Sequence, residues 1–126
     1  MEIVGRFPYI ALTTYRRSGS PVSTPVWVAA SGTKLWVITV DGVGKTKRLA
    51  HTAEVRIQPC DVRGRVSADA PSFTGTARVL RDDESLRIVR QALAAKYRSA
   101  RISEWLARFG GRRRRRRAAI VITLQD

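Results

Sequence analysis

Residues 9–27 read Tyr9-Ile10-Ala11-Leu12-Thr13-Thr14-Tyr15-Arg16-Arg17-Ser18-Gly19-Ser20-Pro21-Val22-Ser23-Thr24-Pro25-Val26-Trp27, a pattern typical of a β-hairpin. Aromatic and β-branched residues dominate Tyr9–Arg16, which predicts a strand, and Arg17–Ser20 supplies a turn. Beyond the turn, small or apolar side chains alternate through Ala29 as in a second strand. Because Pro25 cannot donate a ladder hydrogen bond, we expect this strand to have an edge or a bulge there.

Four further strands are expected after this hairpin. Lys34–Val40 follows a turn at Ser31-Gly32, so the first three strands form a meander of two hairpins. Later strands are predicted at Ala53–Cys60, Phe73–Arg81 and Ala118–Leu124, and a loop at Asp61–Ser72. Gly75, inside the fifth strand, indicates a bulge or the close approach of another backbone.

Helices interrupt the strands in three places. Lys45–His51 is polar enough for a short exposed helix. Acids at Asp82–Glu84 open a longer one, whose apolar stripe consists of Leu86, Val89, Leu93 and Tyr97. A second short helix is expected to hold Ile102, Trp105, Leu106 and Phe109. The long connection before the last strand is typical of a Greek key, so we predict one mainly β domain over residues 1–126, a closed or nearly closed six-stranded antiparallel barrel with short flanking helices.

Composition narrows the functional classes. The 126 residues include 24 Lys+Arg against 10 Asp+Glu, a formal net charge of +14, and the 44% hydrophobic content argues against a disordered chain. No apolar run approaches the ~18 to 20 residues that span a bilayer. No secretory signal is visible at residues 1–6, and one cysteine and one histidine make neither an internal disulfide nor a zinc set. We therefore expect a cytoplasmic domain without metal whose partner is an anion: nucleic acid, an acidic membrane surface or a multiply anionic small molecule.

The segment Gly44-Lys45-Thr46 resembles the end of a phosphate-binding P-loop, but Thr39 stands where that motif needs glycine. The local chemistry still favours an anion site. A strand ends at Val40, a glycine-rich bend follows, and the next helix begins near Lys45 with Lys47 and Arg48 close behind. The alternative is a solvated basic helix face.

Other candidates have simpler interpretations. The run Arg112–Arg117 is either a nucleic-acid patch or a solvated loop. We interpret His51 as a surface residue, Cys60 as an inert buried thiol, and the tryptophans as packing residues. A single histidine leaves no Ser-His-Asp arrangement, so no catalytic side chain is identified and catalysis requires a cofactor.

Three blocks carry a family resemblance: residues 9–27, Gly44–Leu49 followed by Val55–Asp61, and Gly75–Leu80. Their order resembles actinobacterial split-barrel flavin/deazaflavin proteins, the pyridoxamine-phosphate-oxidase-like group of F-420-dependent reductases. The resemblance spans Tyr9–Leu124. It implies a split β-barrel of the FMN-binding type and a homodimer with the cofactor in a groove between subunits.

The resemblance also implies site residues and a reaction. The deazaflavin ring would be flanked by Ser23, Thr24, Pro25, Val26 and Trp27. The phosphate would be held by Thr39, Lys45, Lys47 and Arg48, with Lys47 the most important and Lys45 next. The reduced coenzyme F-420 would pass a hydride to a small conjugated acceptor, and the arginine run could meet the oligoglutamate tail of F-420.

Three alternatives stay open. FMN could occupy the same groove, although the charge of +14 favours F-420 because that coenzyme carries extra carboxylates. A basic barrel could bind single-stranded nucleic acid, but we expect such binding to be weak and non-specific, through Arg112–Arg117. A carrier could store the coenzyme without turnover. No membrane partner is expected.

Overall fold

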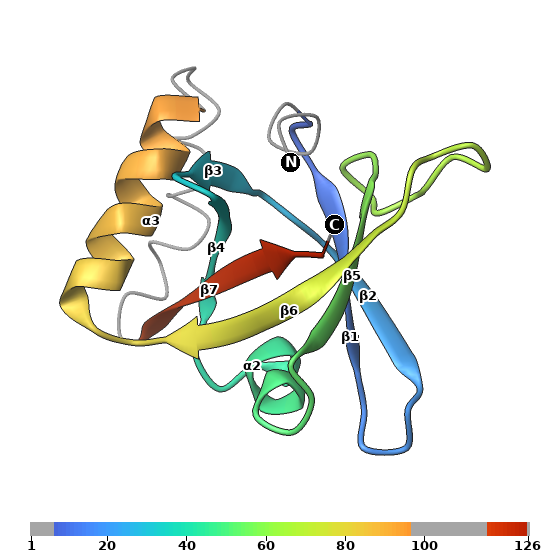
Figure 1. Cartoon of the computed structure of the whole chain (residues 1–126), viewed down its shortest axis with the longest axis horizontal. Coiled ribbons are helices and arrows are strands. Elements are labelled where there is room, and N and C mark those ends of the chain that lie inside the picture. Colours follow the sequence, from blue (N-terminus) through green and yellow to red (C-terminus); the bar gives the residue numbers. More distant parts are fainter. Residues whose placement is uncertain (1–6, 97–115, 126) are drawn as a thin grey trace.

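A computed structural model describes residues 7–96 and 116–125. Its strands form one curled antiparallel sheet, with one helix along its side and a shorter one at its end (Figure 1). The elements, in chain order, are β1 (Ile10–Tyr15), β2 (Pro21–Val26), β3 (Ala29–Ser31), β4 (Lys34–Val40), α2 (Gly44–Leu49), β5 (Glu54–Pro59), β6 (Phe73–Leu80), α3 (Asp83–Lys96) and β7 (Arg117–Leu124).

The sheet has the strand order β2-β1-β5-β6-β7-β4-β3. Its two outer strands, β2 and β3, are joined by only Trp27 and Val28, so the sheet curls and brings one end of each outer strand close to the other. The predicted mainly β barrel is confirmed. Pro25 lies in β2, which is an edge strand, as its missing N–H donor requires.

The strand count of six was wrong, because the described part of the chain already forms a sheet of seven strands. The strand expected to continue through Ala29 breaks, and β2 pairs with β1 whereas β3 pairs with β4. The two residues at the break are both buried, but in different clusters: Trp27 packs beside α3 and Val28 enters the barrel interior. The second predicted hairpin does form, between β3 and β4, but the chain changes sheet edges before it, so the two hairpins do not make a continuous meander.

The last strand closes the Greek key as predicted. β7 pairs on one side with β6 and on the other with β4, so that Ile120 lies between Val79 and Val37. Gly75 sits where β6 and β7 come together, and a β-carbon at this position would collide with the backbone oxygen of Thr123. The expected close approach of another backbone is thus confirmed.

The described residues form two apolar clusters. Ile10, Leu12, Ile57 and Ile120 belong to the barrel interior. A second cluster packs α3 against β3, β4 and β7, and it includes Val89 and Leu93 of the predicted helical stripe. Tyr97 and the helix expected around residues 102–109 lie outside the described residues.

Lys96 fastens the end of α3 to the barrel. Its Nζ donates to the backbone oxygens of Phe7 at 2.7 Å and Val28 at 2.5 Å. Burial lowers the pKa of this lysine to about 8. No helix within the described ranges is long and apolar enough to cross a membrane.

Candidate functional site

The short helix α2 lies across one end of the barrel, against β1 and β6 (Figure 1). Thr46 builds its first turn, since its hydroxyl accepts from Gly42 N at 3.0 Å and donates to Val43 O at 2.9 Å. Leu49 enters the interior core from the other end of the helix. The helix predicted to be exposed is therefore anchored on one face, and its basic side chains have a defined position.

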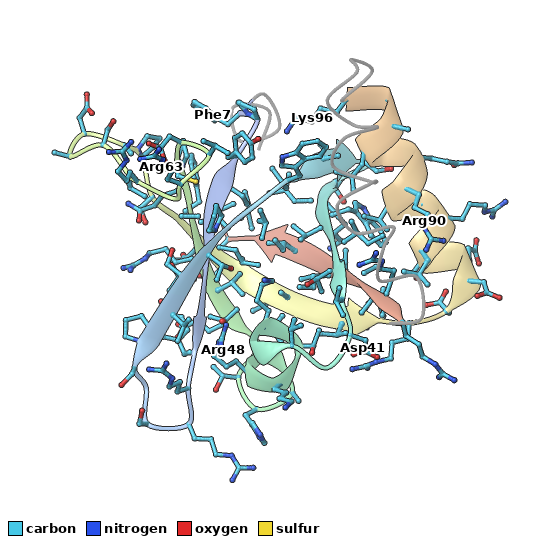
Figure 2. All side chains as sticks on the ribbon, turned by 180° about the vertical axis from the view of Figure 1, so that it is seen from behind. Phe7, Asp41, Arg48, Arg63, Arg90 and Lys96 are labelled. Atoms are coloured by element: carbon cyan, nitrogen blue, oxygen red, sulfur yellow. The ribbon has the colours of Figure 1, made fainter. Side chains whose placement is uncertain are left out.

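Arg48 connects α2 to the first strand. Its Nε donates to the Oγ1 of Thr14 at 2.5 Å, and Thr14 is fully buried near the end of β1. A β-carbon on Gly44 would lie 2.5 Å from Nη1 of Arg48, so the guanidinium folds back over the start of the helix. Figure 2 shows Arg48 between α2 and the β1–β2 hairpin. Gly44 thus provides space for this side chain.

Three cations gather at this end of the barrel. Burial lowers the pKa of the half-buried Lys45, and the charge of Arg48 lowers it further. Burial and the charge of Arg16 lower the pKa of Arg48 in the same way. The ion pairs found within residues 7–96 and 116–125 are Arg65–Asp61 and Arg81–Asp41, and neither involves these cations. We call Arg16, Lys45 and Arg48 the cation cluster. The charge of Arg48 repels that of Lys45 and that of Arg16, so a bound anion would stabilise all three.

The other predicted phosphate residues lie outside this cluster. Lys47 is exposed on α2, and Thr39 is half-buried on β4 opposite Ala118 of β7. Within the part of the chain that the structure describes, no hydrogen bond or ion pair joins either of them to Arg48 or Lys45.

The five residues predicted to flank the ring do not share one face. Ser23 and Pro25 are exposed on one side of β2, whereas Thr24 and Val26 are half-buried on the other. The hydroxyl of Thr24 is buried and has no hydrogen-bond partner among the described residues. Trp27 is 7% exposed and packs edge-on against Tyr9, with ring centroids 6.2 Å apart. The interpretation of this tryptophan as a packing residue is confirmed.

Sequence reasoning did not assign Thr14, Arg16 or Arg17 to the site. Arg17 Nε donates to Nε2 of the exposed His51 at 3.3 Å, which joins the β1–β2 turn to the segment after α2. Two consecutive arginines at the end of a strand were a local signal for this region. Their proximity to α2 could not be predicted from the sequence. In both contacts, Arg17 with His51 and Arg48 with Thr14, the two partners are 34 residues apart in the chain.

The arginine run is described only in its last two residues. Asp41 N donates to Arg116 O at 2.8 Å, and Arg117 is the first residue of β7. Burial lowers the pKa of Arg117, and the charge of Arg90 contributes. Residues 112–115 lie outside the described residues.

Cys60 is half-buried, so the prediction of a buried thiol was correct only in part. Burial raises the pKa of the Cys60 thiol, and the Asp61 charge adds to this shift. The thiol is protonated near neutral pH and is a weak nucleophile, as expected. Residues 7–96 and 116–125 contain no group of three or more His, Cys, Asp and Glu side chains that could hold a metal ion.

Residues 1–126 match the family model described as pyridoxamine 5'-phosphate oxidase. No curated protein sequence matches the chain. Similar solved structures include a conserved hypothetical protein from Mycobacterium tuberculosis (19% identity, 99% of this chain and 78% of that one, TM-score 0.71), an F420 reductase (18%, 99% and 93%, 0.65), and HutZ, a heme storage protein from Vibrio cholerae (12%, 99% and 87%, 0.70). At these identities the structures establish the fold alone.

Proposed function

The chain belongs to the pyridoxamine 5'-phosphate oxidase family, and on that premise we propose that it is an oxidoreductase that binds a phosphate-bearing deazaflavin, coenzyme F-420. The observation that carries this proposal is the cation cluster, in which Arg48 and Lys45 are half-buried and form no ion pair with any carboxylate among residues 7–96 and 116–125. Burying charges without compensation is costly, so such a cluster is suited to a multiply charged anion.

The donors of the cluster fit a phosphate group. Arg48 uses Nε to hold Thr14, which leaves its two terminal nitrogens for a bidentate contact with phosphate oxygens. Lys45 adds an ammonium on the same helix, and Arg16 adds a third charge from the end of β1. Thr14 orients the guanidinium before the ligand arrives, which reduces the entropy cost of binding.

On β2, the exposed Ser23 and Pro25 are the predicted ring-flanking side chains that a ligand can reach. When bound, the deazaflavin would supply hydride chemistry to a small conjugated acceptor. The protein would bind the phosphate, orient the ring and keep water from one of its faces. Nothing in this proposal requires a catalytic acid or base from the chain.

We propose F-420 as the cofactor and not FMN, because the tail of F-420 carries additional carboxylates that basic side chains can pair with. The exposed Lys47 and Arg17 extend the positive surface beyond the cation cluster. The proposal does not include heme binding, which is named for HutZ. The one histidine of this chain, His51, is exposed and accepts a hydrogen bond from Arg17.

Titration of the purified protein with F-420 and with FMN, followed by cofactor fluorescence, tests this proposal. We expect F-420 to bind about fivefold more tightly, since one extra exposed ion pair contributes up to about 1 kcal/mol. The preference should shrink as salt is added. Equal or tighter binding of FMN would reverse the ranking of cofactors, and absence of binding by either would overturn the proposal. A storage protein would bind F-420 equally well but would not oxidise its reduced form when an acceptor is present.

A homodimer is part of the proposal. Ser23 and Pro25 are exposed on an edge strand, so one protomer would leave a bound ring open to solvent. Sedimentation at concentrations that saturate the cofactor should give a dimer. A monomer that binds the cofactor fully would contradict the shared groove.

A further inference from the structure

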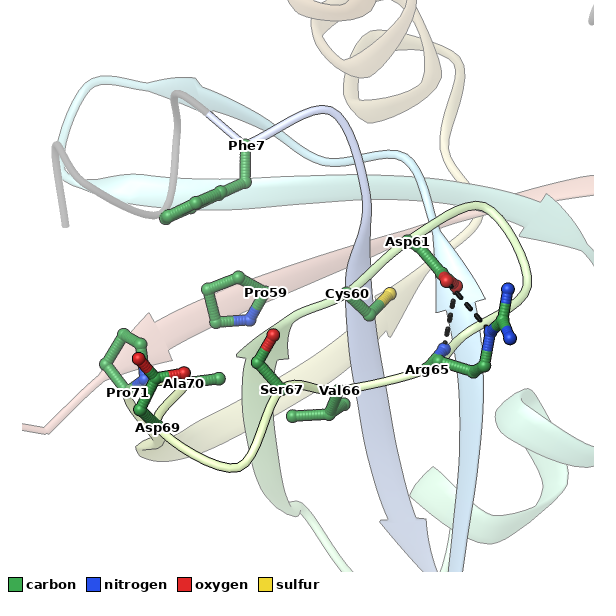
Figure 3. A pocket seen from close by; sticks show the side chains of 10 residues that line it. All are labelled: Phe7, Pro59, Cys60, Asp61, Arg65, Val66, Ser67, Asp69, Ala70 and Pro71. Atoms are coloured by element: carbon green, nitrogen blue, oxygen red, sulfur yellow. Dashed lines mark hydrogen bonds and ion pairs between the residues drawn. The ribbon is translucent and has the colours of Figure 1, made fainter.

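A cavity of about 510 Å³ lies between the loop at residues 61–72, the end of β5 and the segment before β1 (Figure 3). Its volume is in the range of small-molecule sites. Phe7, Pro59 and Pro71 contribute rings to its walls, and Val66, a 36% exposed apolar residue, contributes to another part. The planar ring of Phe7 and the apolar rings of the two prolines can pack against the faces of a planar ligand.

Asp61 shapes the loop wall of this cavity. Its Oδ1 accepts from the backbone N–H groups of Arg63 and Arg65, each at 2.9 Å, and its Oδ2 pairs with Nε of Arg65 at 3.0 Å. These hydrogen bonds, led by the Arg65 backbone, lower the pKa of Asp61. The preceding residue, Cys60, donates its backbone N–H to Tyr9 O at 3.2 Å, which connects the loop to the residue just before β1.

The charge of the cavity is opposite to that of the protein. Its lining includes two carboxylates, Asp61 and Asp69, and one guanidinium, that of Arg65. Asp61 and Arg65 neutralise each other, whereas Asp69 has no hydrogen bond or ion pair to any described residue. The lining is therefore net negative by one charge in a chain of net charge +14. An anion would be drawn to the cation cluster and disfavoured here.

We propose that this cavity binds a planar conjugated molecule that carries no negative charge. The loop also lies against the predicted ring-flanking strand, because a β-carbon on Gly64 would be 3.3 Å from Cδ of Pro25. Gly64 and Pro25 lie outside the lining of the cavity but connect its loop wall to β2, and on the proposed function the bound molecule would be the hydride acceptor.

Cys60 provides a direct readout of occupancy, since it lines the cavity and is the only cysteine in the chain. The rate of its alkylation by iodoacetamide at mildly alkaline pH would be measured with two probes of one ring system: cationic 9-aminoacridine and anionic acridine-9-carboxylate. At ten times its dissociation constant, 9-aminoacridine should slow alkylation by about tenfold, by mass action. The anionic probe at the same concentration should leave the rate unchanged. Protection by neither probe, or equal protection by both, would overturn the proposal.

Two variants make the test specific. Asp69→Asn should weaken protection by 9-aminoacridine, whereas Glu54→Gln, which removes an exposed carboxylate outside the cavity, should not. Equal protection in Asp69→Asn and the unmodified protein would contradict the assigned charge preference. Asp69→Asn should keep its affinity for F-420. Cysteine protection in a protein that binds no F-420 would overturn the proposed function and leave the cavity assignment intact.

Discussion

A chain with valine in place of Gly75 is expected to lose about 3 kcal/mol of its free energy of unfolding, at the upper end of typical overpacking effects. The added β-carbon would collide with the backbone oxygen of Thr123 and lie 3.1 Å from Leu124 Cα. These atoms belong to β7, which pairs with both β6 and β4 and cannot move without disturbing either ladder. A flexible side chain could move away from the added atom at little cost in free energy, but the paired backbone of β7 cannot.

Urea unfolding followed by circular dichroism measures this loss. Thr76→Val is the matched control, because Thr76 is the next residue of β6 and its side chain is exposed. The control should change the free energy of unfolding by no more than about 0.5 kcal/mol. If Gly75→Val unfolds at the same urea concentration as this control, the close approach of β6 and β7 is not a constraint on the fold.

Local periodicity predicted most of the strands. Lys34–Val40 was predicted with the bounds that the structure has, and Phe73–Arg81 ends one residue too late. The break at Trp27-Val28 could not be predicted in this way, because alternation continues through it while the pairing partner changes. Which edge a segment joins depends on strands far along the chain, and local alternation carries no information about them.

For the candidate site, too, the sequence predicted only what depends on neighbouring residues. Glycines followed by Lys45 and Arg48 indicated an anion site from adjacent residues alone. The contact of Arg48 with Thr14 spans 34 positions and has no local signal. The cavity could not be predicted either. The loop at 61–72 is polar and contains no motif that indicates a binding site, and only folding brings Phe7 close to it.

Reversal of the charge at Arg48 is expected to have the largest effect on cofactor binding. Arg48→Glu removes a charge-assisted contact, which contributes roughly 1.5 to 3 kcal/mol, and adds repulsion of the phosphate. The expected loss is about 100-fold in affinity for F-420, measured by fluorescence titration. Lys45→Glu should follow closely, because Lys45 is half-buried beside Arg48.

Lys47→Glu is the matched control for these reversals. The sequence alone ranked Lys47 first, but its side chain is exposed and makes no contact with the cation cluster among the described residues. Solvent and salt screen such a charge, so we expect a loss of only a few-fold, by roughly 1 kcal/mol or less. A larger loss for Lys47→Glu than for Arg48→Glu would restore the sequence-based order. Thermal unfolding of each variant shows whether the barrel is intact.

In the proposed function, the cation cluster binds the phosphate of a deazaflavin. The most direct test compares the affinities of F-420 and of its phosphate-free deazaflavin fragment for the unmodified protein and for Arg48→Ala. We expect Arg48→Ala to weaken F-420 binding by at least about tenfold, the equivalent of one charge-assisted contact, and to leave the affinity of the fragment unchanged. An equal loss for both ligands, or no loss for either, would contradict the proposed phosphate binding.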